Sequence, residues 1–128
     1  MVALGLVVAQ FNKERPVTHE MESRAREAAD EVPGSYDTPL AADRLARRPE
    51  IDAVAVLGAI VTGDTDHDRV IADAAAAGLT DVSLDRDTPV TLGITGPGMS
   101  QAEAEERVHH GASAVRSAIS LAEELDTL

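Results

Sequence analysis

The sequence contains no cysteine and no tryptophan, and it has only one phenylalanine and one tyrosine. Without cysteine, a disulfide framework, a thiolate metal site and a thiol nucleophile are all excluded. No apolar run approaches the roughly 20 residues that cross a bilayer, and the first residues lack the basic region and cleavage site of a signal peptide. We therefore expect a cytoplasmic protein that has no membrane partner.

Positive charge is also scarce. The chain has 11 basic against 23 acidic residues, a net charge of -12, and Lys13 is its only lysine. This balance argues against a general nucleic-acid binder, which needs a basic surface. The acidic residues are spread along the chain, a pattern that halophilic proteins tolerate. We expect a halophilic source, the alternative being an ordinary acidic cytosolic protein.

Three apolar runs have the composition of buried strands, at residues 2–9, 53–61 and 89–95. The run 53–61 shows no alternation of polar and apolar residues, which is typical of a central parallel strand covered on both faces. Strands that alternate with helices predict a parallel α/β sheet built from right-handed crossovers. A length of 128 residues suits one domain over the whole chain.

Four helices are expected from their caps and apolar spacing. The first begins at a cap, Thr18, and has on one face Met21, Ala25, Ala28 and Ala29. The second begins at Asp37 or Thr38, has Pro39 in its first turn, and is expected to bury Leu40, Ala41 and Leu45. The third contains Val70, Ile71, Ala74 and Ala75 and is expected to end at Gly78. The fourth is one long helix that begins with a capping box of Ser100 and Glu103 and has as inner positions Ala104, Val108, Val115, Ile119 and Ala122.

One strand is missing from this pattern. A parallel strand should follow the first helix, yet only Glu31 separates Asp30 from the turn at residues 32–35. Either the protein has lost an edge strand, or a segment is absent here and the numbering runs across the break. An α-carbon step near Asp30 much longer than the usual 3.8 Å or so would indicate a break.

The loops that follow parallel strands lie at the same edge of the sheet. Parallel α/β sheets bind their ligands at this edge, outside the carboxyl ends of the strands. We expect residues 11–12, 34–37, 63–67 and 95–98 to meet at that edge.

Three carboxylates surround His67 in the segment "GDTDHD" at residues 63–68. An EF-hand would need glycine where Arg69 stands and glutamate where Ala75 stands, and a zinc site would need more than one histidine, so we expect no metal. If a helix starts at Asp66, the free amides of residues 63–66 favour an anion. Asp66 and Asp68 then stabilise the helix start, and His67 is either free for chemistry or merely an exposed first-turn histidine.

Several motifs carry a family resemblance that covers nearly the whole chain. They are "QFN" at 10–12, "VPGSYD" at 32–37, "LGAIVTGDTDH" at 57–67, "PVTLGIT" at 89–95 and "AEERV" at 104–108. Together they resemble the 6,7-dimethyl-8-ribityllumazine synthase family of riboflavin biosynthesis, and we expect the source to be a halophilic archaeon. The resemblance implies a flavodoxin-like three-layer sandwich, with a parallel central sheet and helices on both faces.

The family condenses 5-amino-6-(ribitylamino)uracil with 3,4-dihydroxy-2-butanone 4-phosphate, releasing phosphate and water, without cofactor or metal. The resemblance implies that His67 transfers protons. It implies that the pyrimidine and its ribityl chain contact Phe11, Asn12, Gly34, Ser35, Tyr36, Asp37, Ala59, Ile60, Val61 and Leu92, and that phosphate contacts Gly63, Asp64, Thr65 and Arg107. The alternative for Phe11 is a lone core phenylalanine. Without the motif, Arg107 would be interpreted as a solvated charge on the long helix.

This chain also departs from the family's pattern. Asp37 stands where the family usually has glutamate, Thr62 where many members have arginine, and Leu92 where phenylalanine is frequent. Asp68 replaces an aromatic residue, and His110 falls about where a lysine is expected, so a role for His109 or His110 is a guess.

The resemblance further implies a homo-oligomer. Family members form pentamers, many of which close into a 60-subunit icosahedral shell, with each active site shared between neighbours. One subunit then supplies Phe11, Ser35, Asp37 and His67, and the next supplies Leu92 and Arg107. Two alternatives remain, namely an archaeal-type riboflavin synthase paralogue and a non-catalytic flavin-binding or shell-forming homologue.

Overall fold

Four parallel strands form one sheet in the computed structural model, which describes residues 2–9, 30–62, 65–107 and 109–128. The strands are β1 (Leu4–Ala9), β2 (Asp30–Val32), β3 (Ala53–Ala59) and β4 (Val90–Thr95). Their spatial order is β2-β1-β3-β4, and every pairing is parallel. Because β1 and β3 are the inner strands, the two most apolar runs of the sequence occupy the middle of the sheet.

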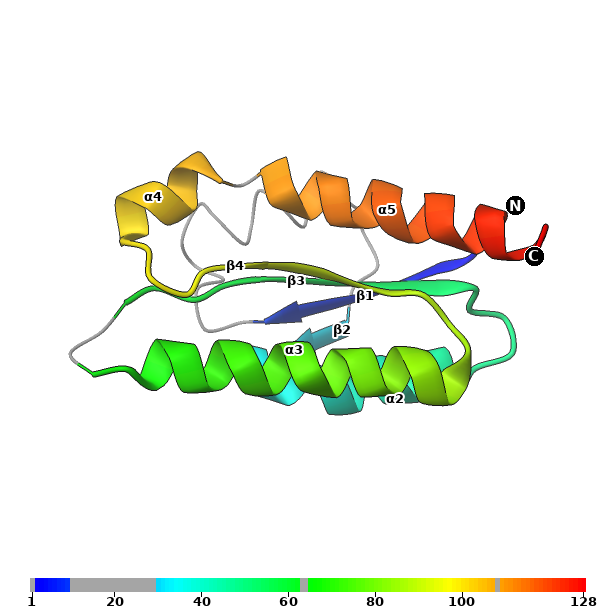
Figure 1. Cartoon of the computed structure of the whole chain (residues 1–128), viewed down its shortest axis with the longest axis horizontal. Helices are drawn as coiled ribbons and strands as arrows, with labels where there is room; N and C mark the ends of the chain where they lie inside the picture. The colour runs from blue at the N-terminus through cyan, green and yellow to red at the C-terminus, as the bar shows by residue number, and fades with distance from the viewer. Residues whose placement is uncertain (1, 10–29, 63–64, 108) are drawn as a thin grey trace.

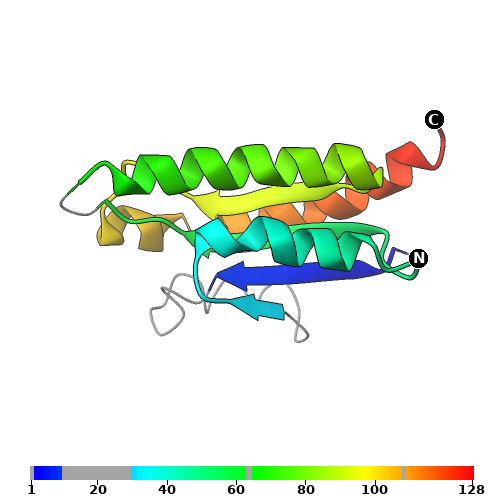
Figure 2. The same ribbon diagram turned by 90° about the horizontal axis from the view of Figure 1, so that it is seen from below.

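Helices cover both faces of this sheet, which confirms the three-layer α/β sandwich (Figure 1). The helices α2 (Thr38–Ala46) and α3 (His67–Arg86) lie on one face, and α4 (Gln101–Glu106) and α5 (His109–Leu125) lie on the other. Figure 2 shows α2 and α3 side by side, with α2 toward β1 and α3 toward β4. None of the helices in these described segments is long and apolar enough to span a membrane.

The core explains why β3 has no polar alternation, since all seven of its residues are buried. Val54 and Val56 face α2 and α3, where they pack near Leu79. Ala53 and Ala55 face the opposite layer and pack against small residues of α5, Ala118 and Ala122. Apolar residues are thus needed at every position, as the sequence predicts for a strand between two helical layers.

The expectation that an edge strand has been lost is wrong, because β2 is an edge strand of three residues. It pairs with the end of β1, with Asp30 opposite Val7 and Val32 opposite Ala9. Three residues are fewer than a typical strand contains. The sheet thus keeps its outer strand in shortened form, and Val32 leads directly into the turn at Gly34.

Helix α3 is longer than predicted, because it passes through Gly78 and ends at Arg86. Gly78 is there for close packing: a Cβ at this position would lie 2.8 Å from Cγ of Pro39 in α2. Of the apolar residues whose spacing predicts this helix, Val70 is 61% exposed and Ala75 is buried.

Two further helix predictions differ from the structure. Leu40 of α2 is exposed rather than buried, although Leu45 is buried as predicted. The single long C-terminal helix is divided into α4 and α5, with a turn at Arg107 between them. Its capping box is confirmed, since the Ser100 amide donates to Glu103 Oε1 and the Glu103 amide donates to Ser100 Oγ, each over 3.2 Å. The helix predicted after Thr18, and the inner positions Ala104 and Val108, lie outside the described residues and side chains.

Candidate active site

The loops that carry most of the predicted site residues lie at one edge of the sheet, where the strands end (Figure 1). Strand β2 leads into Ser35, β3 leads into residues 60–62, and β4 leads into residues 96–99. Helix α3 begins at the same edge with His67. The predicted residues Phe11, Asn12, Gly63 and Asp64 lie outside the described residues.

A short 3-10 turn, Ser35–Asp37, follows β2. Its geometry is held by Asp37, whose Oδ2 accepts a hydrogen bond from the Gly34 amide over 3.0 Å. The Thr38 hydroxyl donates to the Ser35 carbonyl over 2.7 Å, and Ser35 itself is only 7% exposed. Tyr36 is 64% exposed. Asp37 therefore has a structural task in this turn in addition to any contact with a ligand.

The segment after β3 is tied to the segment after β4. The Ile60 amide donates to the Thr95 carbonyl over 2.8 Å, and the Thr62 amide donates to the Met99 carbonyl over 2.9 Å. The Ile60 amide is thus already used within the fold and is not available to a base. Of the other predicted backbone contacts, Ala59 is buried and lies opposite Thr95 in the sheet, while Val61 is half-buried against the core.

The start of α3 presents Thr65 and His67 to solvent. Thr65 Oγ1 accepts a hydrogen bond from the His67 amide over 3.2 Å, which closes the first turn. Asp66 is the N-cap residue but its side chain makes no capping bond. The His67 ring is exposed at the positive end of a helix of 20 residues, where an anion is favoured.

Asp68 lies differently from the expectation that it merely stabilises the helix start. It is only 6% exposed, and its Oδ2 accepts a hydrogen bond from the Gly98 amide over 3.0 Å. The Gly98 amide is the main reason that the pKa of Asp68 lies below the ordinary 3.8, with smaller contributions from the Arg69 amide and the Thr62 hydroxyl, against a cost of burial. Asp68 is therefore ionised at neutral pH and joins two loops of the site.

Helical periodicity could have revealed this inward position. Asp68 shares the buried face of α3 with Ala75, Leu79 and Val82, at spacings of seven, eleven and fourteen residues. The apolar residues Val70 and Ile71, from which the helix is predicted, are exposed and half-buried.

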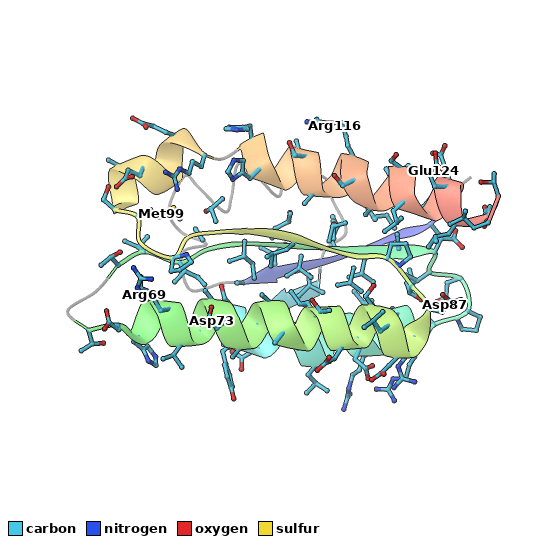
Figure 3. All side chains as sticks on the ribbon, viewed as in Figure 1. Arg69, Asp73, Asp87, Met99, Arg116 and Glu124 are labelled. Carbon is cyan, nitrogen blue, oxygen red and sulfur yellow. The ribbon has the colours of Figure 1, made fainter. Side chains whose placement is uncertain are left out.

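Arg107 lies in the turn between α4 and α5. Its Nη1 is 3.9 Å from Met99 Sδ, and its Nη2 is 3.6 Å from Glu103 Oε2. The side chain remains 44% exposed, so a phosphate can reach the guanidinium. Figure 3 shows Met99 at the same end of the molecule as Arg69, far from Asp87.

Leu92 lies on the outer strand β4 and is 53% exposed. It lines a groove of about 360 Å³ between β4 and α5. The other lining residues are Thr91, Ile94, His110, Ser113, Ala114 and Ser117. Leu92, like Arg107, is therefore accessible from outside the chain.

His110 also contacts its neighbour in the sequence. The rings of His109 and His110 meet edge to face, with centroids 4.5 Å apart.

A larger hollow of about 890 Å³ lies at the opposite end of the sheet, between residues such as Ile51, Asp87 and Leu125. None of the predicted site residues lines it. Within the described segments, no three histidine, aspartate or glutamate side chains are grouped so that they could hold a metal ion.

Comparison with known proteins agrees with the motifs. The family model of 6,7-dimethyl-8-ribityllumazine synthase matches residues 1–126. The 6,7-dimethyl-8-ribityllumazine synthase of Halobacterium salinarum is 67% identical over 135 aligned positions, which cover 98% of this chain and all of the relative. The enzyme of the same name from Halorubrum lacusprofundi is 64% identical, with the same coverage. Both relatives come from halophilic archaea, which supports the halophilic source predicted from the acidic composition.

A more distant relative also aligns with the whole chain. The 6,7-dimethyl-8-ribityllumazine synthase of Methanococcus aeolicus is 42% identical, and the whole of both chains takes part. This alignment has 138 positions for 128 residues, so ten positions have no counterpart in this chain. With a model match over residues 1–126 and relatives of 64–67% identity along its length, the chain belongs to the 6,7-dimethyl-8-ribityllumazine synthase family.

Proposed function

We propose that this protein condenses 5-amino-6-(ribitylamino)uracil with 3,4-dihydroxy-2-butanone 4-phosphate to 6,7-dimethyl-8-ribityllumazine, releasing phosphate and water. The observation that carries the proposal is the match to the family model along residues 1–126. The relatives reported above all have the synthase name, which favours this reaction over that of the riboflavin synthase paralogue. The whole chain acts as a single domain.

His67 is the proton-transfer residue of this proposal. Imine formation, phosphate elimination and ring closure each move a proton, and an imidazole titrates near neutral pH. The exposed position of His67 in the first turn of α3 supports the role, because the ring can reach a substrate above the sheet edge.

The phosphate binds at the start of α3. Thr65 and the preceding amides of Gly63 and Asp64 supply donors at the helix end, where phosphate is favoured. Arg107 contributes a planar pair of donors that suits phosphate. Ser35 and Asp37, at the edge where β2 ends, bind the ribityl chain, and Phe11 stacks on the pyrimidine beside Asn12, Gly34, Tyr36 and residues 59–61.

The active site is shared between subunits of a pentamer. Leu92 and Arg107 are both exposed on the β4 and α5 side of the chain, which supports a role in the site of a neighbouring copy. His67 and Ser35 belong to the other half of such a site. Pentamers of this kind can close into a shell of 60 subunits.

The test follows lumazine formation from the two substrates by absorbance and fluorescence in high salt. For His67→Ala we expect kcat to fall about 100-fold, within the range that general acid–base catalysis supplies. For Arg107→Ala we expect KM for the phosphorylated substrate to rise about 10- to 100-fold, because a charge-assisted hydrogen bond is lost.

Arg116→Ala is the matched control, since Arg116 is an exposed arginine of α5 whose side chain bonds only to Ser113 in the described part of the chain. It should leave both constants unchanged. A folded, assembled parent that forms no lumazine would overturn the proposed reaction. Full turnover in His67→Ala would overturn the proton-transfer role alone.

A further inference from the structure

Among the side chains that the structure describes, Asp68 is the only charged one that is buried. The roles assigned above to His67, Thr65 and Arg107 do not use it. A carboxylate taken out of water is retained only where it is paired or hydrogen-bonded. Its partners therefore indicate what it does.

Those partners lie on the two loops that follow β3 and β4. Asp68 Oδ2 accepts from the Gly98 amide over 3.0 Å, and the Thr62 hydroxyl lies 3.4 Å from the same oxygen. The first bond spans 30 residues of sequence. It connects the first turn of α3, next to His67, with the turn after β4.

The turn that donates this bond contains two glycines with a left-handed backbone. Gly96 and Gly98 have positive φ angles of 101° and 77°. A Cβ at Gly96 would lie 2.3 Å from the Ile60 carbonyl oxygen, so this turn passes directly over the end of β3. The Asp68 carboxylate and the Thr62–Met99 backbone bond of 2.9 Å hold it there.

The same turn determines where Arg107 lies. Met99 follows Gly98, is 1% exposed, and contacts the Arg107 guanidinium through its sulfur. Ser100 then caps α4 through Glu103, whose other carboxylate oxygen is 3.6 Å from Arg107. A continuous series of contacts thus runs from Asp68 through Gly98 and Met99 to Arg107.

We propose that Asp68 is a positioning residue that fixes the turn at residues 96–99 against the start of α3 and thereby places Arg107 for the phosphorylated substrate. The inference rests on the proposed function for the role of Arg107. Asp68 itself touches neither substrate. In a shared active site, each chain supplies His67 to one site and Arg107 to the neighbouring site. The hydrogen bond between Asp68 and Gly98 therefore fixes the relative position of these two residues within one chain.

The kinetic test uses Asp68→Ala, Asp68→Asn and the matched control Asp73→Asn. Asp73 is an exposed carboxylate of the same helix and is labelled in Figure 3. We expect Asp68→Ala to raise KM for the phosphorylated substrate about 5- to 10-fold, with less than a twofold change in KM for the pyrimidine. Asp68→Asn, which retains one acceptor oxygen, should fall between Asp68→Ala and the parent, and Asp73→Asn should match the parent.

A double-mutant cycle tests the route through Arg107. In an Arg107→Ala background, Asp68→Ala should change KM for the phosphorylated substrate no further, because both changes act on one contact. Additive effects would overturn this route. Equal rises in KM for both substrates would overturn it as well, since they would indicate general damage rather than loss of Arg107 placement.

A measurement without turnover separates failure of this inference from failure of the proposed reaction. Hydrogen exchange of the peptide that contains residues 96–99 should be faster in Asp68→Ala than in the parent and in Asp73→Asn. Affinity for inorganic phosphate, measured by calorimetry, should fall in both Asp68→Ala and Arg107→Ala. Unchanged exchange at Gly98 would overturn the positioning role, whatever the reaction proves to be.

Discussion

At the scale of single residues, Thr95 has a buried hydroxyl that makes no hydrogen bond in the described part of the chain. It is 3% exposed and ends β4, opposite Ala59. A buried polar group without a partner costs about 1–3 kcal/mol of stability. Because Thr95 lies at the carboxyl edge of the sheet, its hydroxyl either lowers the stability of the fold or forms a hydrogen bond with a bound ligand.

We predict that Thr95→Val raises the free energy of unfolding by about 1 kcal/mol, because valine has nearly the same shape and no unpaired group. Denaturant unfolding at one protein concentration and in high salt measures the change. Thr91→Val is the matched control: Thr91 Oγ1 donates to the Ala114 carbonyl over 2.7 Å, so its loss should destabilise. If Thr95→Val destabilises the protein like the control, the hydroxyl has a partner after all.

At the scale of elements, the two helices α2 and α3 approach closely where Gly78 meets Pro39. Glycine inside a helix normally costs about 0.5–1 kcal/mol relative to alanine. A Cβ at Gly78, however, would lie 2.8 Å and 3.0 Å from Cγ and Cβ of the rigid Pro39 ring. Packing between the two helices therefore outweighs helix propensity here, and this is why Gly78 does not end α3.

We predict that Gly78→Ala lowers the free energy of unfolding by about 1 kcal/mol, since the 1–3 kcal/mol cost of overpacking exceeds the gain in propensity. Pro39→Ala removes the nearest atom, so the double variant should lose less stability than the two single changes added together. Urea unfolding of the four proteins gives the coupling. A stabilising Gly78→Ala would contradict the close approach.

At the scale of the whole molecule, the net charge of -12 opposes any assembly of identical copies. Like charges on neighbouring subunits repel over roughly 10 Å at 0.1 M salt but only about 3 Å at 1 M. We predict that the assembly becomes larger and more stable as salt concentration rises. Sedimentation in potassium chloride from 0.1 M to 3 M measures this.

Sucrose at matched osmolality is the control for the salt series, because it changes water activity without screening charge. Assembly in sucrose at low salt, or the same sedimentation at both ends of the salt range, would contradict an electrostatic origin.

Particular residues show how far the sequence predicts this protein. The buried strand predicted at 53–61 and the capping box of Ser100 and Glu103 are local patterns. Both are confirmed, although the strand ends at Ala59. The strand of three residues at Asp30–Val32 is too short to have a pattern of its own, and its pairing with β1 defines it. The roles of Phe11, Asn12, Gly63 and Asp64 stay predictions, as do the substrate contacts of the other site residues.

The sequence by itself determined the parallel α/β class, the edge where the loops meet, the acidic surface and the family. Periodicity, caps and motifs are local properties of the sequence, so they can be recognised without knowing how distant segments pack. Only the tertiary structure decided that the Gly98 amide donates to Asp68 and that α3 continues through Gly78, against Pro39. The physical reason is that hydrogen bonds and close contacts between segments 30 or more residues apart depend on the distances of the packed molecule, which no local pattern records.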